Sequence, residues 1–233
     1  MKITIGIDLS IHSTGICIIK EEKEGKSIPS FFLILSDQKY SKVSVEKFHK
    51  YYTENSKKIK NNGIKVLFYE YSSPSKEPLG KEISKSLNVI NILDIIDKNI
   101  LSPIFNKYKK SGNNLKSLIV NIESIALSAS GTIDQLSGLN YGIRYLLLKK
   151  YGLLPENLGL ITPTTLKKNS VGSGKAEKEV MVSSFKLLLS KDKNNKNNKN
   201  NKKLLEDLEY FENNLKWSID DLADAYFLAI NNL

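Results

Sequence analysis

The chain opens with a short apolar–polar alternation that continues after a polar turn. Ile3, Ile5 and Ile7 alternate with other residues, and a second β-branched run covers residues 14–20. Two such runs joined by a short turn predict a β-hairpin. Asp8 stands where the first run ends. Because a carboxylate among buried strands is costly unless a cation or hydrogen-bond donors compensate it, Asp8 is a candidate metal ligand.

Hydrophobic periodicity divides the rest of the chain into strands and helices. Apolar runs predict further strands over residues 30–36, 64–71, 117–124 and 157–162. Helical spacing predicts helices over residues 41–60, 83–110 with a break near Pro103, 133–151, 164–168, 175–190, 204–214 and 219–233. Strands that form a meander first and then alternate with helices favour a mixed α/β sheet with helices on both faces. Gly138 and Gly142 share one helical face, which predicts close packing of that helix against the sheet.

Length and composition indicate one domain, residues 1–233, with insertions. The chain has 233 residues, of which 40% are hydrophobic, and no apolar run approaches the ~18 residues that span a bilayer. Strand pattern follows Met1 and Lys2 directly, so we expect no secretory signal and no membrane association. The single cysteine, Cys17, excludes an internal disulfide, fits a reducing compartment and is expected to be a small buried side chain.

The formal net charge of +10 suggests a polyanionic partner. The Lys/Asn segment 191–203 supplies half of it, with six lysines and one aspartate, and low complexity predicts a solvated loop there. Arg144 is the only arginine among 35 basic residues. Since lysine contacts phosphate as a point charge and arginine reads bases bidentately, we expect contacts to a nucleic-acid backbone rather than base recognition.

Acidic residues occur in three otherwise apolar elements. Asp221 and Asp224 are three residues apart in the last predicted helix and project from one face flanked by apolar residues. Two acids on a core-facing stripe repel each other unless a cation lies between them. Asp220 points away from that face and is better placed to serve the helix N-terminus. Glu123 ends the predicted strand 117–124, as Asp8 ends the first strand.

A set of carboxylates without a cysteine or histidine cluster favours Mg²⁺ or Mn²⁺ over Zn²⁺. Two such ions, roughly 3.5–4 Å apart, promote phosphodiester hydrolysis in many nucleases. The acids therefore predict a two-ion site for phosphoryl chemistry.

Four segments, in order, resemble the RuvC-type Holliday-junction resolvases of the ribonuclease-H-like superfamily. They are I-G-I-D-L-S-I-H-S-T-G at 5–15, I-V-N-I-E-S at 119–124, T-L-K-K-N-S-V-G-S-G-K-A-E-K at 165–178 and D-L-A-D-A at 221–225. The third is the most specific, because a glycine loop followed by A-E-K is particular to the resolvases. The resemblance covers roughly a third of the chain.

This resemblance implies a mixed five-stranded sheet flanked by helices. Relative to compact bacterial members, the chain carries an inserted helix–strand unit at about 41–75 and the Lys/Asn loop 191–203. It also implies that Asp8, Glu123, Asp221 and Asp224 bind the metal ions, with Lys178 as a further catalytic residue. Mg²⁺ or Mn²⁺, two ions per site, is the expected cofactor.

The family's DNA contacts map onto two regions of this chain. Lys167, Lys168, Lys175 and Lys178 lie in the third segment, where family lysines approach the scissile phosphate and the junction backbone. Ser10 and Ser13 lie in the first hairpin turn, beside the metal site. The glycine loop at 171–174 lacks the rest of a nucleotide-binding P-loop pattern, so its amides and lysines are expected to approach a DNA phosphate.

The implied function is that of a crossover junction endodeoxyribonuclease of DNA recombination and repair. Its partner would be branched DNA, especially four-way junctions, and the family suggests a homodimer. The expected location is intracellular, either cytoplasmic or in the replication compartment of a virus- or phage-infected cell. Two alternatives stay open: a ribonuclease-H-fold nuclease for other branched DNA or RNA–DNA hybrids, and a non-catalytic nucleic-acid-binding protein of the same fold.

Glu70 is an alternative to Glu123 as the second acid, because it closes the equally strong strand 64–71. Glu123 is favoured because a long helix, a strand and the V-G-S-G-K loop follow it in the family's order.

Overall fold

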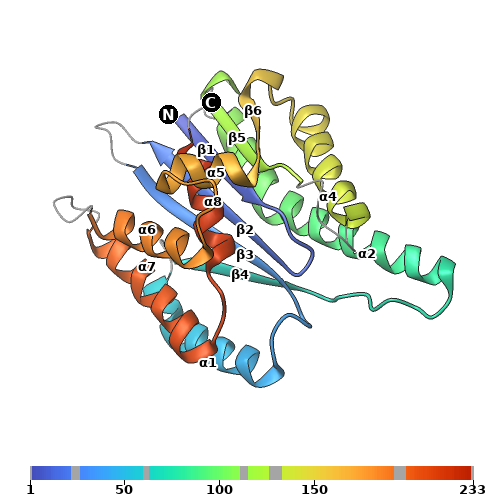
Figure 1. Ribbon diagram of the computed structural model, residues 1–233, viewed down its shortest axis with the longest axis horizontal. Helices are drawn as coiled ribbons and strands as arrows, with labels where there is room; N and C mark the ends of the chain where they lie inside the picture. Colours follow the sequence, from blue (N-terminus) through green and yellow to red (C-terminus); the bar gives the residue numbers. More distant parts are fainter. Residues whose placement is uncertain are drawn as a thin grey trace.

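A computed structural model describes residues 2–21, 27–59, 63–110, 115–125, 133–191 and 198–231. Its centre is a six-stranded sheet in the order β4-β3-β2-β1-β5-β6 (Figure 1). The strands are β1 (Lys2–Asp8), β2 (Ser13–Glu21), β3 (Ser27–Ser36), β4 (Ile64–Tyr69), β5 (Leu118–Glu123) and β6 (Leu158–Ile161). The expectation of a mixed α/β sheet is confirmed. The sheet has six strands rather than five, because β4 adds an edge strand beside β3.

The sheet combines an antiparallel meander with parallel pairs. β1 pairs antiparallel with β2, and β2 with β3. β1 pairs parallel with β5, β5 with β6, and β3 with β4. In this register Ile7 pairs with Ile122 and Asp8 with Gly15. The last residues of β1 and β5, Asp8 and Glu123, therefore leave the sheet side by side.

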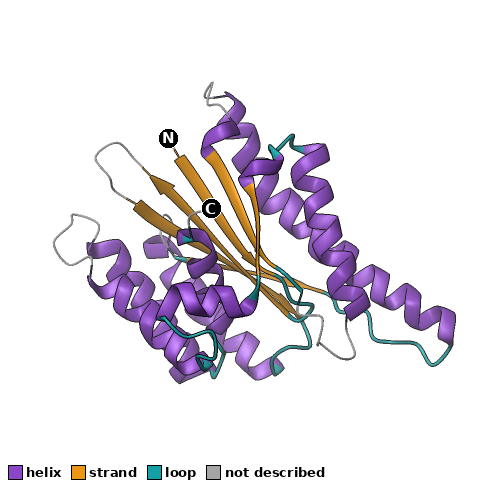
Figure 2. Cartoon of the chain, turned by 45° about the horizontal axis from the view of Figure 1, so that its top comes forward, coloured by secondary structure: helices purple, strands orange, loops and turns teal. Residues whose placement is uncertain are grey.

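Helices cover both faces of the sheet (Figure 2). They are α1 (Lys42–Ile59), α2 (Pro78–Ile96), α3 (Ser102–Lys110), α4 (Ile133–Tyr145), α5 (Pro163–Val171), α6 (Lys178–Lys191), α7 (Asn198–Tyr210) and α8 (Asp220–Ile230). One core joins the sheet to α1, α5, α6, α7 and α8, and a second core joins the other face to α2, α3 and α4. Cys17 is buried in the first core, as expected.

The predicted break near Pro103 is a π-helical turn, Asp97–Leu101, between α2 and α3. Pro103 lies in the first turn of α3, where a missing N–H is tolerated. α2 also begins earlier than its apolar pattern suggested, with Pro78 in its first turn.

The predicted Lys/Asn loop 191–203 is partly wrong. Residues 192–197 lie outside the described part of the chain, but α7 begins at Asn198. Asn201 is buried and donates its side-chain N–H to the Leu189 carbonyl at 3.2 Å. Lys203 forms an ion pair of 2.5 Å with Asp207, one helical turn later. The bond to α6 and the ion pair within α7 stabilise a helix that the composition does not suggest.

Gly138 and Gly142 contact α2, and not the sheet as their spacing suggested. A Cβ on Gly142 would lie 2.4 Å from Cδ1 of Leu93, and one on Gly138 would lie 3.8 Å from the methyl groups of Val89. The small residues let two helices of one layer approach each other closely. None of the helices in the described ranges is long and apolar enough to cross a membrane.

Candidate active site

Helix α8 lies directly on the backbone of β1 and β2. A Cβ on Gly6 would lie 2.0 Å from the carbonyl oxygen of Ala225, and a Cβ on Gly15 would lie 2.1 Å from that of Asp221. Contacts this short leave no room for a side chain. The two glycines therefore bring the first turn of α8 over the end of β1.

Asn121 fixes the other end of α8 to β5. Its side chain is fully buried, and Nδ2 donates to the carbonyl oxygens of Leu228 at 2.8 Å and Asn231 at 2.7 Å. Leu228 lies in the last turn of α8 and Asn231 directly follows the helix, so these carbonyls have no partner within the helix. The helix is thus held at three successive strands, by Gly15, Gly6 and Asn121.

This packing brings together the four acids that the sequence singled out. Asp8 ends β1 and is only 7% exposed, Glu123 ends β5, and Asp221 and Asp224 come from α8. Burial, followed by the negative charges of Glu123, Asp221 and Asp224, raises the pKa of Asp8 well above its usual value. The four carboxylates therefore share one electrostatic environment.

Asp8 and Glu123 interact directly. The Asp8 carboxyl group, when protonated, donates a hydrogen bond to Glu123, and this raises the pKa of Asp8 further. Burial raises the pKa of Glu123, while the bond from Asp8 and the charges of Lys167 and Lys178 lower it. A buried carboxyl group, Asp8, and a half-buried one, Glu123, that share a proton form an arrangement in which a cation can replace that proton.

The two helix acids titrate near neutral pH. Burial raises the pKa of Asp221 to about 6, although the Ser13 hydroxyl donates to its Oδ2. Burial and the charges of Glu123, Asp220 and Asp221 raise the pKa of Asp224 to about 7.

Three lysines surround these acids from different elements. Lys167 on α5 and Lys178 at the start of α6 act on Glu123. Burial raises the pKa of Asp221, and the charges of Lys39 and Lys178 lower it. Lys178 also forms an ion pair with the buried Asp220. Asp220 lies in the first turn of α8, as expected, and it additionally holds Lys178 at the site.

The glycine loop turns the chain between the two lysine-bearing helices. Thr162 caps α5 by accepting from the Thr165 N–H at 3.2 Å. Gly172 ends α5 with φ at 83°, a left-handed conformation that favours glycine. Gly174 lies so close to α5 that a Cβ there would be 2.7 Å from Cγ2 of Thr164. This tight turn brings Lys167 and Lys178 to the same carboxylate.

The remaining residues expected to contact DNA differ in exposure. Lys168 and Lys175 are exposed, on α5 and in the loop after it. The Ser10 amide donates to the Thr14 hydroxyl at 3.1 Å, and this hydroxyl donates to the Ser10 carbonyl at 2.7 Å. Ser13 is only 1% exposed and bonds Asp221. Its side chain is therefore in position to orient a carboxylate and not to contact DNA.

Glu70 and Glu123 occupy different places. Glu70 is exposed after β4, and β3 and β2 separate that edge strand from β1. Glu123 is in the strand next to β1. The structure thus brings Glu123, and not Glu70, to Asp8.

The donor set fits a hard divalent cation, because it consists of carboxylate oxygens. Within the described residues, no group of three or more His, Cys, Asp or Glu side chains has the spacing of a formed metal site. The carboxylates lie in one cluster but would have to move closer to bind a common ion.

The sequence pattern did not reveal two residues that contribute to the candidate site, Lys39 and Asn121. Lys39 follows β3, and its neighbour Tyr40 stacks on Trp217 at 4.7 Å and accepts from the Ser218 N–H at 3.2 Å. These contacts tie the β3–α1 loop to the segment that enters α8. The hydrogen bonds from the Asn121 side chain to the end of α8 are likewise not evident from the sequence. The single local signal is that Asn121 is a polar residue within an apolar strand.

The chain matches no protein-family model and no curated protein sequence. Among solved structures it is similar to RuvC of Thermus thermophilus, with a TM-score of 0.44 and 11% identity over 97% of this chain and 90% of that one. T. thermophilus RuvC in complex with a Holliday junction substrate gives a TM-score of 0.44 and 11% identity, over 98% and 91%. The yeast mitochondrial Holliday junction resolvase Ydc2 gives 0.38 and 15%, over 97% and 75%.

Proposed function

We propose that the protein is a divalent-metal-dependent endonuclease that resolves four-way DNA junctions by paired phosphodiester nicks. The observation that carries this proposal is the convergence of Asp8, Glu123, Asp221 and Asp224 at one end of β1 and β5, with lysines around them. An acidic cluster bordered by cations suits a reaction in which metal ions and a phosphate group must both be bound.

Asp8, Glu123, Asp221 and Asp224 would hold Mg²⁺ or Mn²⁺, two ions per site. Bound ions of this kind polarise the phosphodiester and activate water. Ser13 orients Asp221 through its hydroxyl, and Gly6, Gly15 and Asn121 position the helix that carries two of the four acids.

The lysines bind the DNA backbone in this proposal. Lys167 and Lys178 lie near Glu123, where an ammonium group can stabilise charge that develops on the reacting phosphate. Lys168 and Lys175 extend the same basic border with exposed side chains. Contacts of this type are insensitive to base sequence and weaken as salt concentration rises.

The junction is proposed as substrate because of the resolvase-like segment 165–178, which covers most of α5, the turn after it and the first residue of α6. A homodimer is part of the proposal, since two symmetric nicks in one junction require two sites.

The test is cleavage of a substrate panel by the wild-type chain in Mg²⁺. The panel contains a four-way junction, a fork, a flap, a plain duplex and an RNA–DNA hybrid. We expect paired nicks in the four-way junction, and no cleavage by Asp8→Asn or in EDTA. Junction binding by Asp8→Asn, measured in Ca²⁺, controls for folding. Equal cleavage of every branched form, or cleavage of the hybrid, would show that the substrate is the broader class of branched DNA or RNA–DNA hybrids, and not the four-way junction in particular. Unchanged cleavage by Asp8→Asn would overturn the proposed site.

A further inference from the structure

Two aromatic rings lie at the surface where three segments meet, at the end of the sheet that carries the four acids. The segments are the β1–β2 turn, the β3–α1 loop and the residues after β4 (Figure 1). The rings of His12 and Tyr71 lie 4.8 Å apart between their centres and are tilted by 36°. His12 is exposed and Tyr71 is half-buried. Together they form one aromatic surface, which we call the His12–Tyr71 platform.

Hydrogen bonds to the neighbouring strands hold His12 in place. Its Nδ1 shares a hydrogen bond of 3.1 Å with the hydroxyl of Ser36, which is only 1% exposed. The Ser36 N–H donates to the His12 carbonyl at 3.1 Å. The Tyr69 hydroxyl donates to the carbonyl of the preceding residue, Ile11. A ring that is fixed in this way loses little conformational freedom when a ligand stacks on it.

The segment that carries Tyr71 is bonded to β3 and to α2. The Tyr71 N–H donates to Oδ1 of Asp37, just after β3, at 3.0 Å. The buried side chain of Asn88 accepts from the Ser72 N–H at 2.7 Å and donates to the Ser72 carbonyl at 3.0 Å. The second ring of the platform is therefore also held by the fold.

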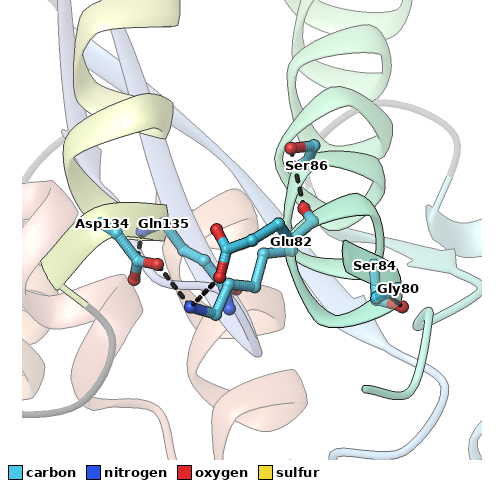
Figure 3. Close-up of polar contacts among 7 residues, drawn as sticks. Gly80, Glu82, Ser84, Ser86, Asp134 and Gln135 are labelled. Atoms are coloured by element: carbon cyan, nitrogen blue, oxygen red, sulfur yellow. Dashed lines mark hydrogen bonds and ion pairs between the residues drawn. The ribbon is translucent and has the colours of Figure 1, made fainter. Parts of the chain in front are cut away.

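Helix α2, along which this segment lies, is itself fixed to α4. Lys85 bonds Glu82 at 3.0 Å and Asp134 at 2.6 Å, and so bridges the two helices (Figure 3). The Ser84 hydroxyl donates to the Ser73 carbonyl at 3.0 Å. The platform thus rests on braced elements, and a ligand would not have to order it.

The platform lies beside the four acids, around the end of β2. Ser13, the residue after His12, donates to Asp221. Neighbouring side chains along a strand point to opposite faces. Ser13 accordingly faces α8, while His12 projects to the side of the sheet where Tyr71 lies. A chain that crosses the strand ends can therefore contact the acids and the platform together.

Lys39 in the β3–α1 loop is close to both places. It is exposed, and its N–H donates to the Ser36 carbonyl at 3.0 Å. Burial raises the pKa of Asp221 and the charge of Lys39 lowers it. Burial and then the same charge lower the pKa of His12, so that its ring is uncharged at neutral pH. One ammonium group thus lies within electrostatic range of the acids and of the platform.

Aromatic rings beside an ammonium group match the two parts of a nucleotide. A base of any sequence stacks on an aromatic ring, and a lysine contacts phosphate as a point charge. A base inside a duplex is covered by its neighbours, so only a base that has left the stack reaches such rings. Branched DNA offers such bases where its arms meet, and a continuous duplex does not.

We propose that the His12–Tyr71 platform stacks an unpaired base of branched DNA, with Lys39 on the phosphate of that nucleotide. This nucleotide neighbours the one whose phosphate reacts at the four acids. Tyr71 lies in the helix–strand unit expected as an insertion at about 41–75, which gives this unit a part in the choice of substrate. The inference rests on the proposed function for the identity of the nucleic acid.

The first test compares the dissociation constants of a four-way junction and of a plain duplex, measured in Ca²⁺ to prevent cleavage. Tyr71→Ala and His12→Ala should each raise the junction constant about tenfold, the effect of one lost stacking contact, and leave the duplex constant unchanged. Tyr71→Phe keeps the ring and should bind the junction within about twofold of wild type. Equal weakening of junction and duplex binding, or no weakening, would overturn the proposal.

The matched controls come from α1, which packs on the opposite face of the sheet. His49 is the other histidine of the chain and is exposed, and Tyr52 is 36% exposed. His49→Ala and Tyr52→Ala should leave both dissociation constants unchanged. A control that weakens junction binding as much as Tyr71→Ala would show that any lost surface ring has this effect, and would overturn the proposal.

Single-turnover cleavage in Mg²⁺ separates binding from damage to the acids. Tyr71→Ala should lower cleavage about tenfold when the protein is below its dissociation constant, and less as the protein saturates the junction. A loss that saturation does not reduce would show that the ring supports the four acids and does not bind a base.

The salt dependence of junction binding tests the lysine. Lys39→Ala should reduce the slope by about one phosphate contact, and Lys50→Ala, at an exposed lysine of α1, should not. An unchanged slope for Lys39→Ala would remove this residue from the proposed contact.

A fluorescent base locates the contact. 2-Aminopurine, placed in turn on each side of the cleaved phosphate, changes its emission when it stacks on an aromatic ring. Wild type and His49→Ala should change the emission at one of these positions, and Tyr71→Ala should not. The same change with all three proteins would contradict stacking on the platform. Weaker binding of single-stranded RNA by Tyr71→Ala, with junction binding intact, would replace branched DNA with RNA as the occupant.

Cleavage assays on the same proteins separate this inference from the proposed function. A wild type that cuts no substrate, together with weakened junction binding by Tyr71→Ala, would support the platform and count against the nuclease. Junction cleavage by wild type, together with unchanged dissociation constants for both ring variants, would do the opposite.

Discussion

Strands β4 and β5 both lead into a glutamate, yet only one of these glutamates reaches the candidate site. β4 pairs with β3 at the edge of the sheet, and Glu70 after it is exposed. β5 pairs with β1, and Glu123 at its end bonds Asp8. The two strands have similar apolar patterns, so the neighbour in the sheet, and not the pattern of the strand, decides which acid can serve the site.

The largest expected effect separates these two acids. Glu123→Gln should lower junction cleavage about a thousandfold or more, because a neutral amide replaces a charged ligand in the cluster. Glu70→Gln is the matched control and should cleave within about twofold of wild type. Single-turnover cleavage in Mg²⁺ measures both. Equal loss in the two variants would contradict the assignment of Glu123.

The next effect concerns the glycine beneath α8. Gly6→Ala should displace α8, since its Cβ would lie 2.0 Å from a backbone oxygen. Overpacking of this kind costs about 1–3 kcal/mol, or several degrees in melting temperature for a chain of this size. Cleavage should fall with it, because Asp221 and Asp224 move with the helix.

Gly138→Ala is the same substitution where the new Cβ has only ordinary contacts at 3.8 Å. It should leave the melting temperature unchanged or raise it slightly, since alanine favours the helix. A Gly6→Ala protein as stable and as active as wild type would show that α8 does not depend on the close contact.

A smaller effect is expected from the lysines. Lys167→Ala should lower cleavage about tenfold and reduce the salt dependence of junction binding by about one phosphate contact. Lys76→Ala, at an exposed lysine in the loop before α2, should change neither. Binding isotherms at several salt concentrations measure the slope, and identical slopes for wild type and Lys167→Ala would remove this residue from the DNA contact.

The smallest effect is a dependence of stability on pH in EDTA. The pKa of Asp224 is about 7 in the folded protein, against an ordinary value of 3.8. The folded state therefore binds more protons between these values, and the free energy of unfolding falls as pH rises through about 7. The melting temperature of wild type should drop more between pH 5 and 8 than that of Asp224→Asn. Parallel curves would contradict the raised pKa.

Local patterns in the sequence indicated most elements and the acids of the candidate site. Asp8 and Glu123 are visible because each ends an apolar strand, and Asp221 and Asp224 because they are three apart on an apolar helix. The bond from Ser13 to Asp221 spans 208 residues and has no local signature.

Other features depended on partners that come from distant elements. The composition of residues 198–203 suggests a solvated loop, but α7 packs on the core and Lys203 contacts both Asp207 and Tyr51 of α1. The spacing of Gly138 and Gly142 indicated a close contact without showing that α2 makes it. Tertiary contacts decided these cases and not local preference.

Helix α8 packs on β1 although the two elements lie far apart in the sequence. During synthesis the first hairpin leaves the ribosome long before residue 220, so β1 and β2 have an apolar face without its cover for most of translation. Contacts of such wide sequence separation form slowly. Because half of the acid cluster arrives with this last helix, an incomplete chain would lack two of the four acids of the candidate site.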